Sequence, residues 1–207
     1  MTAMKTVKKN TKRGRPLSFN RENALHTALQ LFWKQGYEGT SIADLVGAMG
    51  IAPPSLYTAF GSKEQLYLEV VDLYLKGPGN FIQHALAHTN DARSFTQQVL
   101  SSAANEFTAH AHPPGCIVSS GLLTSATLHN RMAQSMSELR TATLGLIHKR
   151  FEEAKDCGEL PASTNCHSLA RFFGAVIQGM SIQARDGAEA AELHDMASQA
   201  MASWPRA

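Results

Sequence analysis

Arg13 and Arg15, separated by a single glycine, are the first residues of the chain whose types and spacing point to a chemical role. They lie within residues 1–21, which hold seven of the 19 Lys and Arg residues and none of the 17 Asp and Glu residues. A basic end on an acidic body is expected when that end contacts a polyanion. The charge run taken alone is also typical of a solubilising tail.

The run from Lys12 to Pro16 resembles the core of an AT-hook. In such a core, arginines on either side of a glycine lie in a narrow A·T-rich minor groove, where the negative potential is concentrated. We expect Arg13 and Arg15 to bind DNA in this way. Residues 1–17 would then form a basic disordered arm ahead of a folded module, as the N-terminal arms of homeodomains do.

A second group of candidate residues follows two adjacent prolines, Pro53 and Pro54. If Ala52 is an N-cap, both prolines occupy the first helical positions, where the backbone amide has no intrahelical partner to lose. Hydroxyl groups on such a helix can bond bases or phosphates, proline can pack against a thymine methyl, and Lys63 at the next helix start suits a phosphate. The DNA-binding residues predicted from these patterns are Arg13, Arg15, Pro53, Pro54, Ser55, Tyr57, Thr58 and Lys63; the family resemblance given below implies Ser41 as well, and Thr40 beside it is included in the prediction.

The stretch "HAHPPGCIVSSG" holds a third group, Cys116 with His110 and His112. Cys116 opens a predicted helix, whose free amides favour the reactive thiolate form of a cysteine. A site with two imidazole nitrogens and one sulfur would suit a transition metal. A free cysteine is also commonly a small buried apolar residue. Packing, thiol sensing and metal binding therefore all stay open for Cys116.

Helices must position these residues, and local patterns predict where the first helices begin and end. Asn20 can cap a helix with a regular apolar face that stops near Gly36. Thr40 or Ser41 begins a second helix, which ends at Gly50. A short third helix starts at Pro53 and stops at Phe60-Gly61, and Ser62 caps a fourth. Two short helices joined by a tight turn form a helix-turn-helix, whose second helix would present its polar residues outward.

The run from residue 18 to about 76 resembles the DNA-binding domain of the TetR family of transcriptional regulators, with "GYEGTS", "LYTAF" and "SKEQLY" in register. The resemblance implies an all-helical homodimer with an N-terminal three-helix helix-turn-helix domain, which reads an operator. A larger helical C-terminal domain would bind a small molecule that releases the double-stranded DNA. By position, Pro53, Pro54, Ser55 and Tyr57 match recognition-helix residues, and Ser41, Tyr57 and Lys63 match phosphate contacts.

Two departures from the family pattern stand out: Ala43 and Pro53 occupy positions where some members carry long polar base-reading residues. Direct readout of bases would then be thin, which gives more weight to the arginine arm and to DNA shape. The segment "VIQGMSIQARDGA" and the terminal "WP" are also similar to a copper-responsive branch of the family.

The remainder of the chain divides at "GPG" (residues 77–79), which predicts a DNA-binding domain at residues 18–78 and a ligand-binding and dimerisation domain at 79–207. Its predicted helices run near 80–88, 92–111, 117–127, 131–156, 165–185 and 188–203, with breaks at "HPPG" and "CGELPAST". A broad apolar stripe in the fifth of these helices is interpreted as partly core and partly a two-fold helical interface. Its residues are Leu169, Phe172, Phe173, Val176, Ile177, Met180 and Ile182.

Composition and missing motifs exclude other classes of protein. The chain lacks a phosphate-binding glycine loop, an HExxH motif and a GxSxG elbow, so we expect no enzyme and no cofactor. No apolar run is long enough to span a membrane, and no apolar segment follows the N-terminal lysines as in a secretory signal. Three cysteines at no disulfide spacing indicate a reducing compartment, so we expect a cytoplasmic protein. A DNA-binding protein without any ligand remains the alternative to a ligand-released repressor.

Overall fold

The computed structural model describes residues 20–123 and 130–205, and within these ranges it holds helices and no strand. In chain order the elements are α1 (Arg21–Gly39), α2 (Ile42–Met49), α3 (Pro53–Phe60), α4 (Lys63–Lys76), the 3-10 turn η1 (Pro78–Asn80), α5 (Phe81–His88), α6 (Ala92–Phe107), α7 (Ile117–Ser120), α8 (Asn130–Asp156), α9 (Cys166–Arg185) and α10 (Ala190–Ala202). The predicted all-α class is confirmed.

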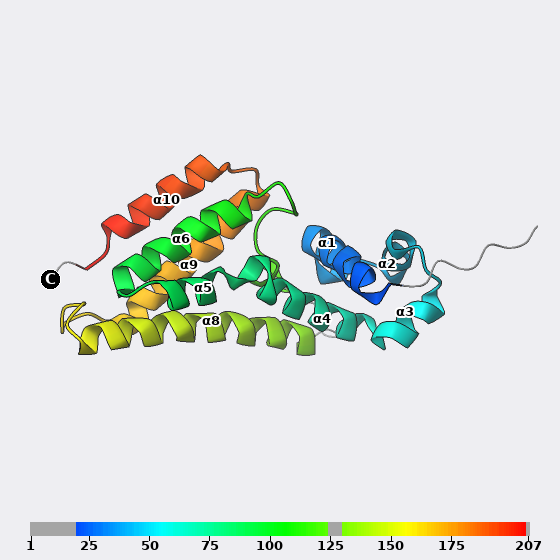
Figure 1. Ribbon diagram of the computed structural model, residues 1–207, viewed down its shortest axis with the longest axis horizontal. Helices are drawn as coiled ribbons and strands as arrows, with labels where there is room; N and C mark the ends of the chain where they lie inside the picture. The colour runs from blue at the N-terminus through cyan, green and yellow to red at the C-terminus, as the bar shows by residue number, and fades with distance from the viewer. Residues whose placement is uncertain (1–19, 124–129, 206–207) are drawn as a thin grey trace, which may run out of the picture.

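Helices α1–α4 form the end of the molecule that we call the head, and α5–α10 form the larger part that we call the body (Figure 1). Helix α4 runs from the head to the body and joins the two (Figure 1). In the body, α8 packs against α9, while α6 lies between α9 and α10. One continuous apolar core extends through both parts.

Local capping explains where the head helices begin. The side chain of Asn20 accepts a hydrogen bond of 3.0 Å from the amide of Asn23, as an N-cap does. Ala52 stands at the N-cap of α3, so that Pro53 and Pro54 are its first residues and interrupt no helix. Gly36 has a φ of 76°, a left-handed value that glycine adopts without strain, and it kinks α1 where the sequence predicted a stop.

Two predicted helices of the body are longer in the sequence analysis than in the structure. The helix predicted over 92–111 ends at Phe107, and the chain then turns toward the two prolines, Pro113 and Pro114. The helix predicted over 117–127 is a single turn, Ile117–Ser120. Residues 121–123 are not helical, and residues 124–129 lie outside the described ranges.

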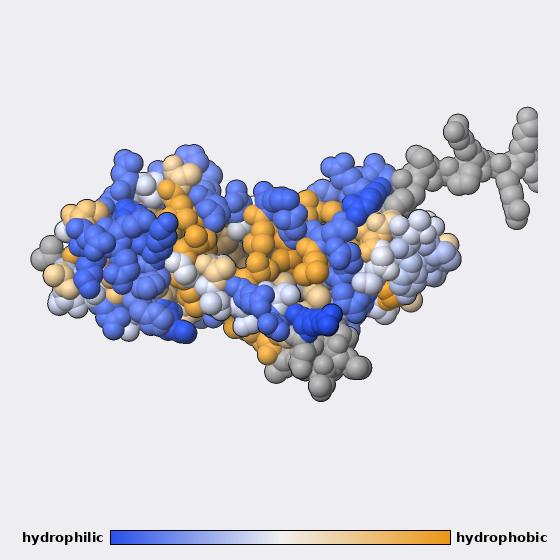
Figure 2. Space-filling view, turned by 90° about the horizontal axis from the view of Figure 1, so that it is seen from below, coloured by the Kyte–Doolittle hydropathy of each residue, from blue (hydrophilic) through white to orange (hydrophobic). Residues whose placement is uncertain are grey.

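The apolar stripe of α9 is divided between interior and surface. Phe173, Ile177 and Met180 are buried, whereas Phe172 and Ile182 keep 42% and 46% of their surface exposed. Apolar residues also reach the surface along the middle of the face seen from below in Figure 2. Within the described ranges, no helix is both long enough and apolar enough to cross a bilayer.

Candidate DNA-binding surface and interior cavity

Helix α3 turns one face to solvent and the other into the head. Leu56 and Phe60 are buried, whereas Tyr57 keeps 48% of its surface exposed. The other exposed residues of this helix are Pro53, Pro54, Ser55 and Thr58. The hydroxyl of Thr58 donates to the carbonyl of Pro54 at 2.8 Å, so its oxygen keeps free lone pairs. The helix therefore offers an outward row of hydroxyl groups and flat apolar rings.

Helix α2 precedes this surface and begins with a capping box. The hydroxyl of Ser41 accepts from the amide of Asp44 at 3.1 Å, while the Asp44 carboxylate accepts from the amide and the hydroxyl of Ser41. These bonds lower the pKa of Asp44. Ser41 is exposed and stands at the end of α2 where free amides can meet a phosphate.

Thr40 does not belong to this surface, and its prediction as a DNA-binding residue is corrected. Its side chain is fully buried, and its hydroxyl donates to the carbonyl of Gly36 at 2.7 Å. The threonine therefore faces the interior of the head, next to the kink at Gly36.

Lys63 stands at the first position of α4, next to the C-terminal end of α3. Its ammonium group lies 4.3 Å from the centre of the Tyr37 ring, over the ring face, where a cation is attracted. Partial burial lowers the pKa of Lys63. The ring holds the long side chain at one place, so its charge is positioned at the start of a helix.

Arg21, near the N-terminal end of the head, contacts other helices of the head. One of its terminal nitrogens donates to both carboxylate oxygens of Glu69, at 2.8 and 2.6 Å, and its Nε donates to the carbonyl of Ala59 at 3.3 Å. The guanidinium also lies 4.6 Å from the centre of the Phe60 ring. Arg21 therefore braces α1 against α3 and α4. The predicted arm with Arg13 and Arg15 lies outside the described residues.

The three residues of the "HAHPPGC" segment are not gathered into one site. His110 is exposed, whereas His112 stacks on Trp33 with ring centres 4.2 Å apart. Cys116 is buried, and its sulfur accepts from the amide of Ser119 at 3.4 Å. Among residues 20–123 and 130–205, no three His, Cys, Asp or Glu side chains are placed to hold a metal ion.

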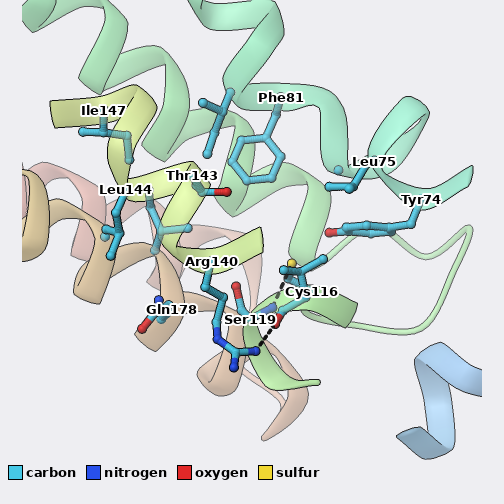
Figure 3. Close-up of a pocket in the computed structure, with 15 residues that line it drawn as sticks. Tyr74, Leu75, Phe81, Cys116, Ser119, Arg140, Thr143, Leu144, Ile147 and Gln178 are labelled. Carbon is cyan, nitrogen blue, oxygen red and sulfur yellow. Dashed lines mark hydrogen bonds between the residues drawn. The ribbon is translucent and has the colours of Figure 1, made fainter. Parts of the chain in front are cut away.

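An interior cavity of about 60 Å³ lies in the body where α4, α5, α7, α8 and α9 meet (Figure 3). Polar groups on its wall include Tyr74, Cys116 and Arg140. Its apolar wall residues are Leu75, Phe81, Ile82, Val118, Leu144, Ile147 and Ile177. Burial raises the pKa of Tyr74 well above its ordinary value and lowers the pKa of Arg140. The cavity is thus mainly apolar, with a few polar groups at its edge.

A set of long-range contacts joins the wall of this cavity to the head. The indole of Trp33, in α1, donates to the carbonyl of Gly115 at 3.1 Å. Arg185, at the end of α9, donates to the carbonyls of Trp33 and Lys34 at 3.1 and 3.2 Å and to the hydroxyl of Ser120 at 3.3 Å. We call these contacts the junction. They lie beside α7, which forms part of the cavity wall.

Two parts of the chain match models of known protein families. Residues 24–70 match the model described as "Bacterial regulatory proteins, tetR family", and residues 93–201 match "Tetracyclin repressor-like, C-terminal domain". The chain belongs to the TetR family. Among curated TetR-family relatives, it is 33% identical over 200 residues to the HTH-type transcriptional repressor ComR of Escherichia coli (strain K12), covering 96% of this chain and 94% of ComR. The repressor BdcR of the same organism is 28% identical over 185 residues, covering 89% of this chain and 88% of BdcR.

A solved TetR-family structure shows the same architecture on DNA. The regulator CifR, as a cysteine mutant complexed with a 26-bp double-strand operator, is 36% identical and superposes with a TM-score of 0.87. The alignment covers 92% of this chain and all of that one. This TetR-family chain is therefore a DNA-binding transcriptional regulator, and its relatives are regulators rather than enzymes.

Sequence reasoning missed several residues that the structure brings together. Tyr74, to which the sequence analysis assigns no role, lies on the cavity wall. Trp33 and Arg185 are 152 positions apart and meet at the junction. A run of apolar residues in α1 and a basic residue in the last turn of α9 were visible in the sequence, but no local pattern indicates that they touch.

Proposed function

We propose that this TetR-family regulator is a ligand-released repressor that binds a palindromic operator as a homodimer. The observation that carries this proposal is the exposed row on α3, which begins at the two prolines of its N-terminus and is flanked by Ser41 and Lys63. Base-edge contacts would come from Pro53, Pro54, Ser55, Tyr57 and Thr58, and phosphate contacts from Ser41, Tyr57 and Lys63. The arm with Arg13 and Arg15 would read A·T-rich flanking sequence.

The proposed dimer would use the outward part of the α9 stripe. Phe172 and Ile182 are large apolar residues left exposed on one helix of the body, and Val176 between them is half-buried. A two-fold interface built from the same patch on both copies would remove them from water. We place the dimerisation and ligand-binding domain at residues 79–207 and the DNA-binding domain at 18–78, with the boundary at Gly77–Gly79.

Release would follow from a change in the distance between two recognition helices. In a dimer on DNA they must stand about 34–36 Å apart, one helical turn of the duplex. A ligand that binds the cavity a hundredfold more tightly in another geometry contributes about 2.7 kcal/mol toward release. The junction supports this route, because Trp33 bonds Gly115, the residue before Cys116 of the cavity wall, and Arg185 ties the end of α9 to α1.

The test compares operator DNA with random DNA in a quantitative binding assay. Ser55→Ala and Tyr57→Phe should weaken operator binding far more than random binding, whereas Lys63→Ala should weaken both about equally. Ser198→Ala, which removes an exposed hydroxyl from α10, is the matched control and should change neither. Footprinting that protects no inverted repeat, or a monomer on DNA at micromolar protein, contradicts the proposal.

The arm is tested by deleting residues 1–16. Operators with A·T-rich flanks should lose more affinity than operators with G·C-rich flanks, since a narrow minor groove attracts the arginines most strongly. An equal loss of affinity on both kinds of flank would show that the arm binds DNA without preference for the flanking sequence.

Thiol sensing at Cys116 is the second candidate, favoured over a copper response by the structure of the loop. The Cys116 thiol lies on the cavity wall with an amide directed at it, whereas no metal-binding group forms among the described residues. Peroxide should then release the parent protein and the Cys157→Ser control from DNA, but not Cys116→Ser. Copper release that needs Cys116 would favour the metal site instead. Normal release of Cys116→Ser by every inducer found would leave Cys116 with a packing role.

A DNA-binding protein without a ligand is the remaining alternative. A thermal-stability screen of small molecules distinguishes it, because a specific ligand of the folded state raises the melting temperature by mass action.

A further inference from the structure

The hydroxyl of Tyr74 is a buried polar group without a nitrogen or oxygen hydrogen-bond partner among the described residues. The residue is 1% exposed, and it lies on the wall of the cavity with its hydroxyl directed toward Cys116 (Figure 3). Burial, and after it the neighbouring Cys116 thiol, raise the pKa of Tyr74, but a thiol is only a weak hydrogen-bonding group and does not replace an oxygen or nitrogen partner. Buried hydroxyl groups are almost always satisfied, so one that is left open beside a cavity indicates a missing partner.

The backbone holds the Tyr74 ring at this place. A Cβ atom on Gly79 would lie 2.5 Å from the ring of Tyr74, so η1 packs directly on the ring and only glycine leaves it room. The ring also meets Trp33 edge to face, with centres 4.9 Å apart. A hydroxyl held in one position is a built feature of the cavity, since the ring cannot swing away to find water.

The size of the cavity limits what can fill it. Its volume of about 60 Å³ is well below the roughly 150 Å³ of a cavity that holds benzene, and it equals the space of about four water molecules. A molecule of about three to five non-hydrogen atoms therefore fits within this volume without moving the walls.

The charge of the surroundings limits the ligand further. Arg140 is the charged residue of the wall, and the two hydrogen bonds from its Nη1 atom to the carbonyls of Val118 and Gly121, at 3.0 and 2.9 Å, hold its charge at the α7 side of the cavity. Its guanidinium lies on the far side of Cys116 from Tyr74 (Figure 3). A carboxylate at the Tyr74 hydroxyl would lose its hydration without gaining a counterion there, which strongly disfavours it.

We propose that the cavity binds a small, uncharged, largely apolar molecule whose one oxygen accepts a hydrogen bond from Tyr74, such as a short-chain ketone or aldehyde. This inference rests on the proposed ligand-released function and names the chemical class of its ligand. The oxygen completes the bonding of the hydroxyl, and the carbon atoms meet the apolar walls formed by Phe81, Leu144 and Ile147. A ligand of four non-hydrogen atoms binds with a dissociation constant of about 40 µM at best.

Acetone, acetate and isobutene test this class, because they share one planar shape of four non-hydrogen atoms. Each is titrated into the full chain without DNA, and dissociation constants come from nuclear magnetic resonance shifts of the cavity residues. Acetone should bind most tightly, and Tyr74→Phe should weaken it about three- to tenfold, the effect of one hydrogen bond. The affinity for isobutene should not fall in that variant. Tyr37→Phe removes a phenol hydroxyl in the head, away from the cavity wall, and should leave all three affinities unchanged.

Three outcomes overturn the proposal: acetate binding more tightly than acetone, equal binding of acetone by the parent and Tyr74→Phe, or shifts confined to residues away from the cavity. The experiment contains no DNA, so its result is separate from that of the release mechanism. Acetone bound through Tyr74 without any change in operator affinity would support the ligand class and contradict ligand release.

Discussion

Arg185 is the residue whose replacement should separate the head from the body most clearly. Its guanidinium bonds the partly buried carbonyl of Trp33 and two exposed acceptors, the carbonyl of Lys34 and the hydroxyl of Ser120. We assign about 1 kcal/mol to the first bond and about 0.5 kcal/mol to the other two together, because solvent screens the exposed ones. Arg185→Gln should therefore destabilise the chain by about 1.5 kcal/mol, which lowers the melting temperature by about 3–6 °C for a chain of this size.

The matched control is Arg171→Gln on the same helix. Arg171 is exposed, and its Nε bonds only the side chain of His167, at 3.1 Å, one turn away. An exposed contact within one helix contributes little, so this variant should lose less than about 0.5 kcal/mol. The two arginine variants change net charge equally, so any difference between them reports the contacts of Arg185.

The assay uses the two tryptophans of the chain. In a Trp204→Phe background, Trp33 becomes the only tryptophan, whose emission can be excited selectively over that of tyrosine, and it lies within the junction that Arg185 holds. Urea unfolding of this parent should give one transition by fluorescence and by circular dichroism. With Arg185→Gln, the Trp33 signal should change at lower urea than circular dichroism does. Equal losses for Arg185→Gln and Arg171→Gln, or coincident transitions in both, would refute the role of the junction.

Three further predictions concern backbone geometry and caps. Gly115→Ala should cost about 2 kcal/mol or more in urea unfolding, because Gly115 has a φ of 78° and a Cβ atom would lie 2.6 Å from the carbonyl of Ser181; an unchanged midpoint would contradict this. Asn20→Ala should cost about 1 kcal/mol through loss of the α1 cap, and a loss below 0.3 kcal/mol (about the error) would count against it. Hydrogen bonds from Ser94 lower the pKa of Asp91. The parent should therefore be more stable than Asp91→Asn above the ordinary Asp pKa, and this difference should disappear as the pH falls through the lowered pKa. Urea unfolding of both proteins at pH 7 and pH 3 tests this, and a difference that grows on acidification would contradict it.

The sequence by itself determined the helices of the head and the surface they present. Caps and stops act within one turn of the chain, so Asn20, Ser41, Pro53 and Ser62 could be read directly as helix starts. The alternation of buried Leu56 with exposed neighbours on α3 follows from the helical period alone. These residues needed no knowledge of distant contacts, and the structure agrees with each of them.

Local patterns failed where a side chain had a choice of partners. Thr40 is predicted to contact DNA, but its side chain is buried and its hydroxyl bonds the carbonyl of Gly36. The helix predicted to reach residue 111 ends at Phe107, before the turn that leads to Pro113 and Pro114. The apolar period reports neither the inward direction of Thr40 nor the position of that turn.

The tertiary structure alone decided the cavity and the junction. Tyr74 and Cys116 lie on one wall although 42 residues separate them, and Arg185 meets Trp33 across 152 positions. Packing of α4, α7, α8 and α9 creates these contacts, and each of the segments could keep the same helical pattern in a different arrangement. Contacts between distant segments depend on how whole helices fill space, so a local sequence pattern carries no record of them.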